Sequence, residues 1–240
     1  MPVVTGRAEH LPPFKRVGHK GADLVSPGNT LASFDAALEH GVDMVEFDVL
    51  RLEDGRLVLA HDYHDAQRPD VVTLDEGLDH FAGEAYANVE LDVDLKLPGY
   101  EREVVEGLAA RGLVERSLIS TMYTESLDLI GRIDREQRRG WSVPRTRSDP
   151  TQSAWRKPFA LAAIAVMRRL LPGQAERMVR AGRCEALMTH WRLMSPRLVQ
   201  GVHAAGGQVY VWTVDDSDHI EQLSALGVDG VISNDPRLFT

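Results

Sequence analysis

Several features that identify common protein classes are missing from this chain of 240 residues. Its one cysteine, Cys184, excludes an intramolecular disulfide and favours a reducing compartment. No Walker-type loop is present, and no G-x-G-x-x-G turn follows a strand pattern. The longest apolar run, residues 158–167, is too short to cross a bilayer. Residues 1–14 lack the apolar core of a secretory signal, so we expect a cytoplasmic protein.

Positive charge is also in short supply, with 27 Lys and Arg against 36 Asp and Glu and a net charge of −9. Nucleic-acid-binding surfaces are usually basic, so we do not expect a nucleic-acid partner. The net negative charge does not exclude a small phosphate compound as substrate, because a few nearby cationic side chains or a metal ion can outweigh the field of distant carboxylates. With 43% apolar residues the chain can bury a sizeable core. The sequence leaves the oligomeric state open.

Short strand patterns and helical patterns alternate along nearly the whole chain. Several helical patterns end in glycine, as at Gly41, Gly112 and Gly227, which is typical of helix C-termini before a turn. Eight parallel strands with helices between them predict an α/β fold, a (β/α)₈ TIM barrel, in a single domain over residues 1–240. The expected strands are Arg16–His19, Asp43–Val49, Asn88–Lys96, Ser117–Thr121, Arg138–Val143, Ala186–His190, Gln208–Val214 and Asp229–Ser233. The expected helices include Thr30–His40, Tyr100–Arg111, Thr124–Glu136, Ser195–Ala205 and Ser217–Leu226.

A ninth strand pattern, Leu57–Asp62, does not fit the parallel count. Only eight residues separate Asp48 from Leu57, which is too few for a helical crossover. The turn Glu53-Asp54-Gly55 is typical of a hairpin. We therefore expect an extra β-hairpin after the second strand, which brings His61 back near the mouth of the barrel.

The region 144–185 is less regular. Its first part has the composition of a loop, and the run up to about Arg180 is helical, with Pro172-Gly173 breaking it in two. The apolar stretch Ala160–Met167 beside Arg168 and Arg169 suits a membrane surface or an acyl groove. We favour a barrel helix with a buried apolar face, so membrane contact stays an alternative that is not favoured.

Carboxylates alternate with apolar residues in the strand Asp43–Val49. Glu46 and Asp48 share one face, and the apolar residues between and beside them share the other. Two carboxylates that point into a barrel repel each other unless a cation or a base neutralises them. Oxygen ligands of this kind suit Mg²⁺ or Ca²⁺. A solvated edge strand is the alternative interpretation of this pattern.

The strand Asn88–Lys96 repeats the alternation more strongly, because Glu90, Asp92, Asp94 and Lys96 all share one face. Ionisable groups inside a barrel are costly unless they pair or bind something. Asp94 and Lys96 are nearest the carboxyl end of the strand, so we expect them in the functional site. For Glu90 and Asp92 we expect structural roles.

Two histidines, His19 and His61, each follow an apolar run and precede a turn. Histidine exchanges protons near neutral pH, so one ring can take a proton from an attacking oxygen while the other protonates a leaving alkoxide. Together with the carboxylates, this pattern predicts metal-assisted cleavage of a phosphate ester at the strand ends. His190, also at a strand end, stays ambiguous, and we expect the remaining histidines to be structural.

Six short motifs follow one another in an order known from one family. They are His19-Lys20-Gly21 with Pro27-Gly28-Asn29-Thr30, Glu46-Phe47-Asp48, His61-Asp62, Asp94-Leu95-Lys96, VYVWTVDD and GVDGVISNDP. In these residues, from about Val17 to Pro236, the chain resembles the glycerophosphodiester phosphodiesterase family. The resemblance implies a barrel enzyme that hydrolyses glycerophosphodiesters to sn-glycerol 3-phosphate and an alcohol.

The resemblance also implies a role for individual residues in binding and catalysis. His19 and His61 are implied to be the general acid and base. Glu46, Asp48 and Asp94 are implied to be ligands of one divalent cation, Mg²⁺ or Ca²⁺. Lys20 and Lys96 are implied to contact the phosphate, and Trp212 is implied to line the pocket.

Three residues depart from the family's motifs. Lys20 stands in place of an arginine, Gly28 in place of a glutamate, and Asp94 in place of a longer glutamate. Lysine keeps the charge of arginine but loses its two-pronged contact with phosphate oxygens. Two rival functions remain: a lipid phosphodiesterase of lysophospholipase D or sphingomyelinase D type, and a catalytically inactive barrel that acts as a binding protein.

Overall fold

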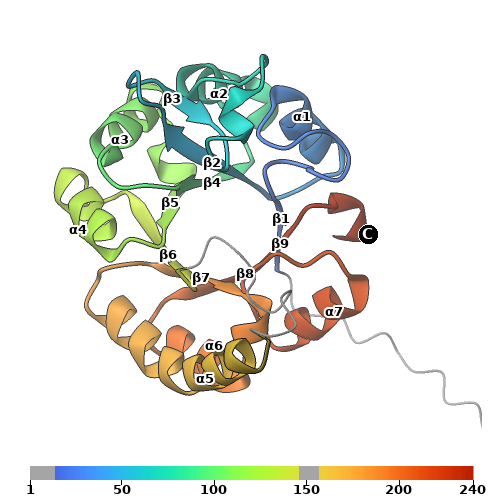
Figure 1. Ribbon diagram of the computed structural model, residues 1–240, viewed down its shortest axis with the longest axis vertical. Coiled ribbons are helices and arrows are strands. Elements are labelled where there is room, and N and C mark those ends of the chain that lie inside the picture. The colour runs from blue at the N-terminus through green and yellow to red at the C-terminus, as the bar shows by residue number, and fades with distance from the viewer. Residues whose placement is uncertain (1–13, 146–156, 240) are drawn as a thin grey trace, which may run out of the picture.

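The computed structural model describes residues 14–145 and 157–239. Within these residues nine strands form one sheet, and β1 pairs with both β2 and β9, so the sheet closes into a barrel (Figure 1). Eight of the strands pair in parallel, and helices cover the outside of the barrel (Figure 1). The predicted (β/α)₈ barrel is therefore confirmed.

The strands are β1 (Lys15–Gly18), β2 (Met44–Arg51), β3 (Leu57–Leu59), β4 (Glu90–Leu95), β5 (Ser117–Thr121), β6 (Arg138–Val143), β7 (Ala186–His190), β8 (Gln208–Trp212) and β9 (Gly230–Ser233). The α-helices are α1 (Leu31–Glu39), α2 (Leu74–Phe81), α3 (Glu101–Ala110), α4 (Thr124–Ile133), α5 (Lys157–Arg180), α6 (Pro196–Ala204) and α7 (Ser217–Ala225). Short 3₁₀ helices occur at Asp65–Gln67, Glu84–Tyr86, Val114–Arg116, Trp191–Leu193 and Pro236–Phe239.

The extra hairpin expected after the second strand is present. Strand β3 pairs antiparallel with β2, with Val49 opposite Leu59 and Arg51 opposite Leu57. The amide of Leu52 donates to the carbonyl of Arg56 at 2.9 Å and closes the turn. The hairpin then leads into helix α2, which is not among the helices expected from the sequence, although Leu74, Leu78 and Phe81 recur at helical spacing. A second local signal for this helix exists, because Thr73 and Glu76 form a reciprocal capping box at its start.

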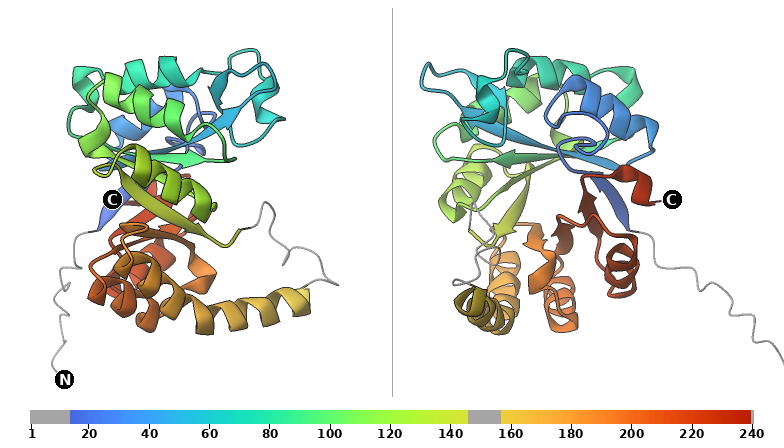
Figure 2. Two further views of the ribbon diagram at one scale, coloured as in Figure 1. Left: turned by 90° about the vertical axis from the view of Figure 1, so that its left-hand side faces the viewer. Right: turned by 45° about the vertical axis from the view of Figure 1, so that its right-hand side comes forward.

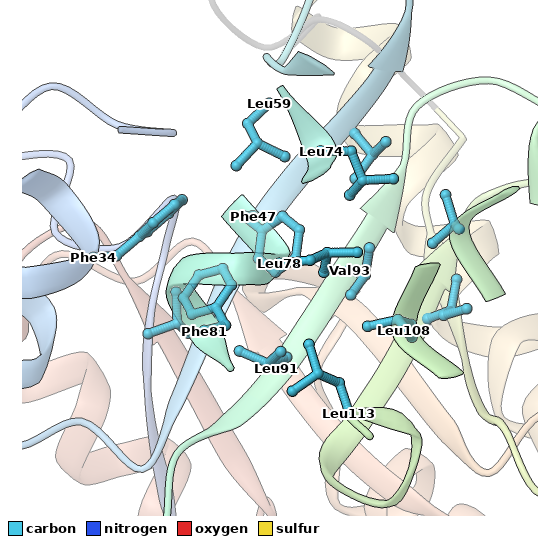
Figure 3. Close-up of a cluster of buried hydrophobic side chains, with 14 of the residues drawn as sticks. Phe34, Phe47, Leu59, Leu74, Leu78, Phe81, Leu91, Val93, Leu108 and Leu113 are labelled. Atoms are coloured by element: carbon cyan, nitrogen blue, oxygen red, sulfur yellow. The ribbon is translucent and has the colours of Figure 1, made fainter. Parts of the chain in front are cut away.

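The apolar face of β2 and β4 packs against the surrounding helices, as the alternation predicts. Figure 3 shows Phe47 and Val93 of these strands meeting Phe34 of α1 and Phe81 of α2. The rings of Phe47 and Phe81 stack with their centroids 5.0 Å apart. Inside the barrel, a smaller apolar cluster is formed by Val17, Met44, Leu118, Ala186, Met188, Tyr210 and Ile232. Glu46, Asp48 and Asp94 lie toward the other end of the interior, nearer the carboxyl ends of β2 and β4.

Helix α5 differs from the prediction in two respects. It is one helix from Lys157 to Arg180 with Pro172 inside it, so the expected break is wrong. An interior proline removes one helical hydrogen bond at a cost of about 3 kcal/mol. Here the flanking turn is held by packing, because Leu171, Pro172 and Ala175 are buried against the barrel. The second difference is that residues 161–167 are largely exposed instead of forming a buried face.

The expectation of one domain over residues 1–240 includes residues 1–13, 146–156 and 240, which lie outside the described residues, so it stays a prediction. In the part of the chain that the structure describes, no helix combines the length and apolar character needed to cross a membrane.

Candidate active site at the barrel mouth

A pocket of about 160 Å³ opens at the carboxyl ends of the strands. Six of the eight predicted site residues line it: His19, Glu46, His61, Asp94, Lys96 and Trp212. Asp48 lies directly beneath, in contact with Lys96. Only Lys20 points its charged group elsewhere, as described below. The pocket therefore brings together groups from β1, β2, β4, β8 and the segment after β3.

The carboxylates of Glu46, Asp48 and Asp94 form one cluster whose ligand oxygens all lie within 4.8 Å of one another. The register explains this closeness, because Asp48 of β2 stands directly opposite Asp94 of β4. Glu46 and Asp48 are buried, at 4% and 0% exposure. Burial raises the pKa of Glu46 well above its ordinary value, and the nearby charge of Asp48 raises it further. A cation in the cluster would relieve this repulsion.

The chemistry of the three carboxylates fits a metal ion, and the position of Asp48 among them is fixed by its neighbours. Asn29 clamps the residue on one side, because its Nδ2 donates to Oδ2 of Asp48 at 2.8 Å and its Oδ1 accepts from the Asp48 amide at 3.0 Å. The other oxygen, Oδ1, is buried and pairs with the ammonium of Lys96. Three carboxylates are the ligand type that Mg²⁺ and Ca²⁺ prefer. The donor set present therefore suits a hard divalent cation.

Lys96 neutralises part of this negative charge. Its ammonium contacts Asp48 and lies 2.5 Å from the carboxylate of Asp94. Although burial opposes a charged lysine, the two aspartates and Glu46 raise the pKa of Lys96 well above its ordinary value. Burial also opposes ionisation of Asp48, but Lys96, His61 and His19 together lower its pKa. Lys96 is therefore charged, and Asp48 is held as a carboxylate.

His19 is held in a defined orientation by residues from the end of the chain. Its Nδ1 lies 2.5 Å from Oδ1 of Asn234, and Nδ2 of Asn234 donates to Asp215 at 2.7 Å. With the amide oriented in this way, Nδ1 of His19 carries the proton and Nε2 is free to accept one. Nε2 lies 3.8 Å from Glu46 Oε2. Burial lowers the pKa of His19, so the ring is neutral near pH 7.

His61 stands at the junction of two pockets. Its side chain is 43% exposed, and Nδ1 lies 3.7 Å from Oδ2 of Asp62. The second pocket, of about 130 Å³, shares His61, Lys96 and Met122 with the first. Apolar side chains such as Leu50 and Leu97 form much of its remaining wall. The ring of His61 therefore faces both the carboxylate cluster and a less polar space beyond it.

Lys20 and Gly28 form a linked pair through Asp23. The ammonium of Lys20 lies 2.9 Å from Oδ2 of Asp23, and Oδ1 of the same residue accepts from the Gly28 amide at 2.8 Å. A Cβ at position 28 would lie 2.5 Å from Oδ1 of Asp23 and 2.8 Å from Cβ of Lys20. Lys20 also donates its backbone amide to Glu46 at 2.7 Å. Its contact with a phosphate stays a prediction.

Glu90 and Asp92 occupy different environments. Glu90 pairs with Lys15 and with Arg138 at the amino end of the barrel, in the structural role expected for it. Asp92, for which the same was expected, lines the site pocket instead. Its Oδ1 is buried and, within the described residues, accepts no hydrogen bond. Burial raises the pKa of Asp92 to about 8.

The remaining aromatic groups frame the opposite wall. Trp212 lines the pocket, and its ring meets His190 edge-on with the centroids 5.2 Å apart. His190 stacks on Trp191 and accepts from the amide of Arg192 at 3.2 Å, so it supports this wall. The sequence patterns did not assign roles to Asn29, Asp215 or Asn234. For Asn234 the available signal was the polar pair Asn234-Asp235, which directly follows the last strand.

A family model described as "Glycerophosphoryl diester phosphodiesterase family" matches residues 19–95 and 63–238. The chain belongs to this family. The match includes every residue that lines the pocket, from His19 to Ile232. It confirms the resemblance inferred from the six motifs and the enzyme class they predicted, a phosphoric diester hydrolase that acts on glycerophosphodiesters.

Characterised relatives and solved structures agree with this assignment. A glycerophosphodiester phosphodiesterase of Caldanaerobacter subterraneus is 26% identical over 92% of this chain and 94% of its own length. The glycerophosphodiester phosphodiesterase GDPD4 of Arabidopsis thaliana is 25% identical over 96% of this chain and 73% of its own. An Oleispira antarctica phosphodiesterase, solved in complex with the product sn-glycerol-3-phosphate, has the same fold with a TM-score of 0.69, 23% identity and coverage of 95% and 94%.

Proposed function

We propose that this chain cleaves glycerophosphodiesters to sn-glycerol 3-phosphate and an alcohol. In this proposal His19 is the general base and His61 is the general acid. Glu46, Asp48 and Asp94 are the ligands of one Mg²⁺ or Ca²⁺ ion. The observation that carries the proposal is the single pocket into which both histidines and the carboxylate cluster converge. The phosphodiesterase of Oleispira antarctica that was solved with sn-glycerol-3-phosphate supports the choice of product.

The first step uses a hydroxyl of the glycerol group next to the phosphate. Nε2 of His19 takes the proton of this hydroxyl while its oxygen forms a bond to phosphorus. The phosphorus–oxygen bond to the alcohol breaks, and His61 gives its proton to the departing oxygen. Attack within one molecule gains from proximity, because the reacting groups are already held together. Positioned proton transfer of this kind contributes roughly 10²–10⁴-fold.

The second step opens the resulting cyclic phosphate with water. The roles of the two rings reverse, so that His61, now neutral, takes a proton from water and His19 returns a proton to the glycerol oxygen. In both steps Lys96 lies close enough to the cluster to face the negative phosphoryl oxygens. A divalent cation bound by the cluster would offset the charge that develops on these oxygens.

Release of glycerol 3-phosphate from glycerophosphocholine and related diesters, with Mg²⁺ and with Ca²⁺, tests the proposal. His19→Ala should lower kcat at least about 100-fold, the scale of general base catalysis. Glu46→Gln removes a proposed cation ligand, so it should lower activity and raise the concentration of divalent cation that activity requires. His64→Ala, whose side chain is 94% exposed, is the matched control and should keep full activity. Activity that persists in His19→Ala removes the assigned base. Full activity after exhaustive chelation removes the metal ion.

A lysophospholipid is a second candidate substrate. It is favoured by the pocket next to His61, where Leu50 and Leu97 offer apolar contact to a substituent larger than a small alcohol. A panel that compares glycerophosphocholine with lysophosphatidylcholine of increasing chain length separates the two substrates. Choline release that rises with chain length supports the lipid, and no turnover of any lysophospholipid excludes it. A cytoplasmic location, which we infer from the single cysteine, stays a prediction for cell fractionation.

A further inference from the structure

Helix α5 consists of two halves with opposite surroundings. In the second half, Leu171, Ala175, Met178 and Val179 are buried against the barrel. In the first half, residues 161–170, Leu161, Val166 and Leu170 are 51%, 55% and 57% exposed. We call residues 161–170 the projecting half of α5. Large apolar side chains with this exposure are unusual on a helix that is continuous with a buried one.

The first seven residues of the projecting half are apolar around the circumference of the helix. Residues 161–167 read LAAIAVM and contain no polar side chain. Only Ile164 and Met167 pack partly against the core. A surface helix normally carries one apolar stripe and one polar face, and a helix that is apolar all round is normally surrounded by apolar material. Within the described residues, most of these apolar side chains face outward, so an apolar phase outside the protein would be needed to bury them.

A groove continues the apolar surface next to the helix. It has a volume of about 360 Å³ and lies between α5, the turn Trp191–Leu193 and α7. Its apolar walls include Leu161, Ile164 and Leu223, and Arg168 and Arg192 also line it. Arg168 donates to the carbonyl of Met194 at 2.9 Å, which holds its positive charge at this surface.

The projecting half lies on the same side of the molecule as the active site. In the left-hand view of Figure 2, α5 runs out beyond the barrel in the direction of the β2–β3 hairpin, past the carboxyl ends of the strands. His61 follows that hairpin and lines the site pocket. A flat surface that touched the projecting half would therefore face the mouth of the barrel.

Charge distinguishes the occupants that could cover this surface. The protein carries a net charge of −9, yet Arg168 and Arg169 directly follow the apolar run and Arg192 lies in the groove. A second copy would bring the same arginines to the interface and would cover only one side of the helix. An anionic lipid surface offers apolar contact around the helix and phosphate groups for the arginines.

We propose that the projecting half of α5 and the adjoining groove form a membrane-contact surface that binds the interface of an anionic bilayer and turns the mouth of the barrel toward the lipid. Amphipathic and apolar helices of this kind enter the boundary between headgroups and acyl chains to a depth of roughly 5–10 Å. The arginines lie at the level of the headgroups. Binding depends on this surface alone and not on catalysis.

Co-sedimentation with vesicles tests the proposal without any assay of activity. The full chain should bind vesicles that contain phosphatidylglycerol roughly tenfold better than vesicles of pure phosphatidylcholine, and salt should weaken this preference. The double variant Leu161→Glu/Val166→Glu should lose binding at least about tenfold. Arg168→Gln/Arg169→Gln should reduce binding to the anionic vesicles and leave the weak binding to phosphatidylcholine unchanged.

The matched control is Ala109→Glu/Ala110→Glu. These residues are exposed on α3 near the opposite end of the barrel, and the variant adds the same two negative charges. It should bind anionic vesicles like the unaltered chain. Thermal unfolding of both double variants checks that each is folded, and glycerophosphocholine turnover, where present, should be equal in both.

Three outcomes overturn the proposal. The first is no binding to either vesicle, and the second is equal binding by Leu161→Glu/Val166→Glu and the unaltered chain. The third is a dimer in analytical ultracentrifugation that the same double variant dissociates, in the absence of vesicle binding, because the surface would then be covered by a second copy. Loss of hydrolysis in all forms would contradict the proposed function and leave the vesicle result standing.

Discussion

The ammonium group of Lys96 lies 2.5 Å from the carboxylate of Asp94, its second neighbour along β4. The two side chains are on one face of the strand because strand residues two apart point in the same direction. The same ammonium contacts Asp48 on the adjacent strand. Lys96 therefore competes with a bound cation for two of the three carboxylates in the cluster. The stability of the protein therefore depends on the charge of Lys96 and on the charge of any cation bound by the cluster.

Lys96→Gln should make the protein depend on a divalent cation for its stability. The variant leaves Asp48 and Asp94 without their buried partner, and such a loss costs about 3–5 kcal/mol. We expect a lower Tm in chelator, and a larger rise in Tm on adding Mg²⁺ or Ca²⁺ than in the unaltered chain. Thermal unfolding with and without the ions measures both. Lys15→Gln, at the other end of the barrel, should show an unchanged ion effect. Equal ion-induced shifts in all three proteins would contradict this account.

Asn234→Ala should impair catalysis while the fold stays intact. Without the amide, Nδ1 of His19 loses its hydrogen-bond acceptor, and Nε2 is no longer the preferred proton acceptor. We expect kcat to fall roughly tenfold or more with little change in KM, since such supporting contacts typically contribute on that scale. Steady-state kinetics measure this split. Asn88→Ala, an exposed asparagine, is the control. A change confined to KM would show that Asn234 acts on substrate binding instead.

Gly28→Ala should disturb the first loop through steric overlap. The added Cβ would lie 2.5 Å from the Asp23 carboxylate and 2.8 Å from Lys20, both closer than van der Waals contact allows. Overpacking of this kind costs about 1–3 kcal/mol. We expect a lower Tm and a lower kcat/KM, because Lys20 also holds Glu46 through its backbone amide. Gly201→Ala is the control: its nearest atom is 3.9 Å away, so it should keep kcat/KM and should not lower Tm, because alanine favours the interior of helix α6.

The ion pair of Arg16 and Asp43 predicts a pH dependence of stability. Burial opposes ionisation of Asp43, but hydrogen bonds from Arg16 outweigh it and lower the pKa of Asp43 below its ordinary value. The pair therefore stabilises the fold above the unfolded-state pKa, and this contribution is lost as the pH falls through the lower folded-state pKa. Because both side chains are about 40% exposed, we expect only about 1 kcal/mol.

Urea unfolding of Asp43→Asn at neutral pH and at roughly pH 3 checks this sign. The deficit of the variant relative to the unaltered chain should be present at neutral pH and shrink in acid. Asp70→Asn, an exposed aspartate, should show no such trend. If the loss of unfolding free energy in Asp43→Asn grew as the pH fell, the ion pair would not be the cause of the pH dependence.

Much of the barrel follows from local patterns. The alternation in β2 and β4 separates apolar from charged faces, and closing the sheet must then turn one face inward, because side chains alternate strictly along a strand. The short interval between Asp48 and Leu57 allows only a hairpin, and the structure confirms it. These predictions depend on neighbours in the chain, where spacing and conformation are directly coupled. Helix α2 carries two local signals as well, the capping box of Thr73 and Glu76 and the helical spacing of Leu74, Leu78 and Phe81.

Contacts between distant residues were decided by the tertiary structure. Asn234 reaches His19 across 215 positions, and the β2–β4 register, which no local pattern reports, sets Asp48 opposite Asp94. The first half of α5 has the more apolar sequence, yet packing against the barrel buries side chains of the second half and carries the helix through Pro172. Residue types and their spacing thus determined which chemical groups this protein can bring to its barrel mouth. Closure of the sheet decided which of these groups meet at the mouth and which apolar surface stays exposed. The physical reason is that the burial of a side chain depends on the elements packed against it and not on its residue type alone.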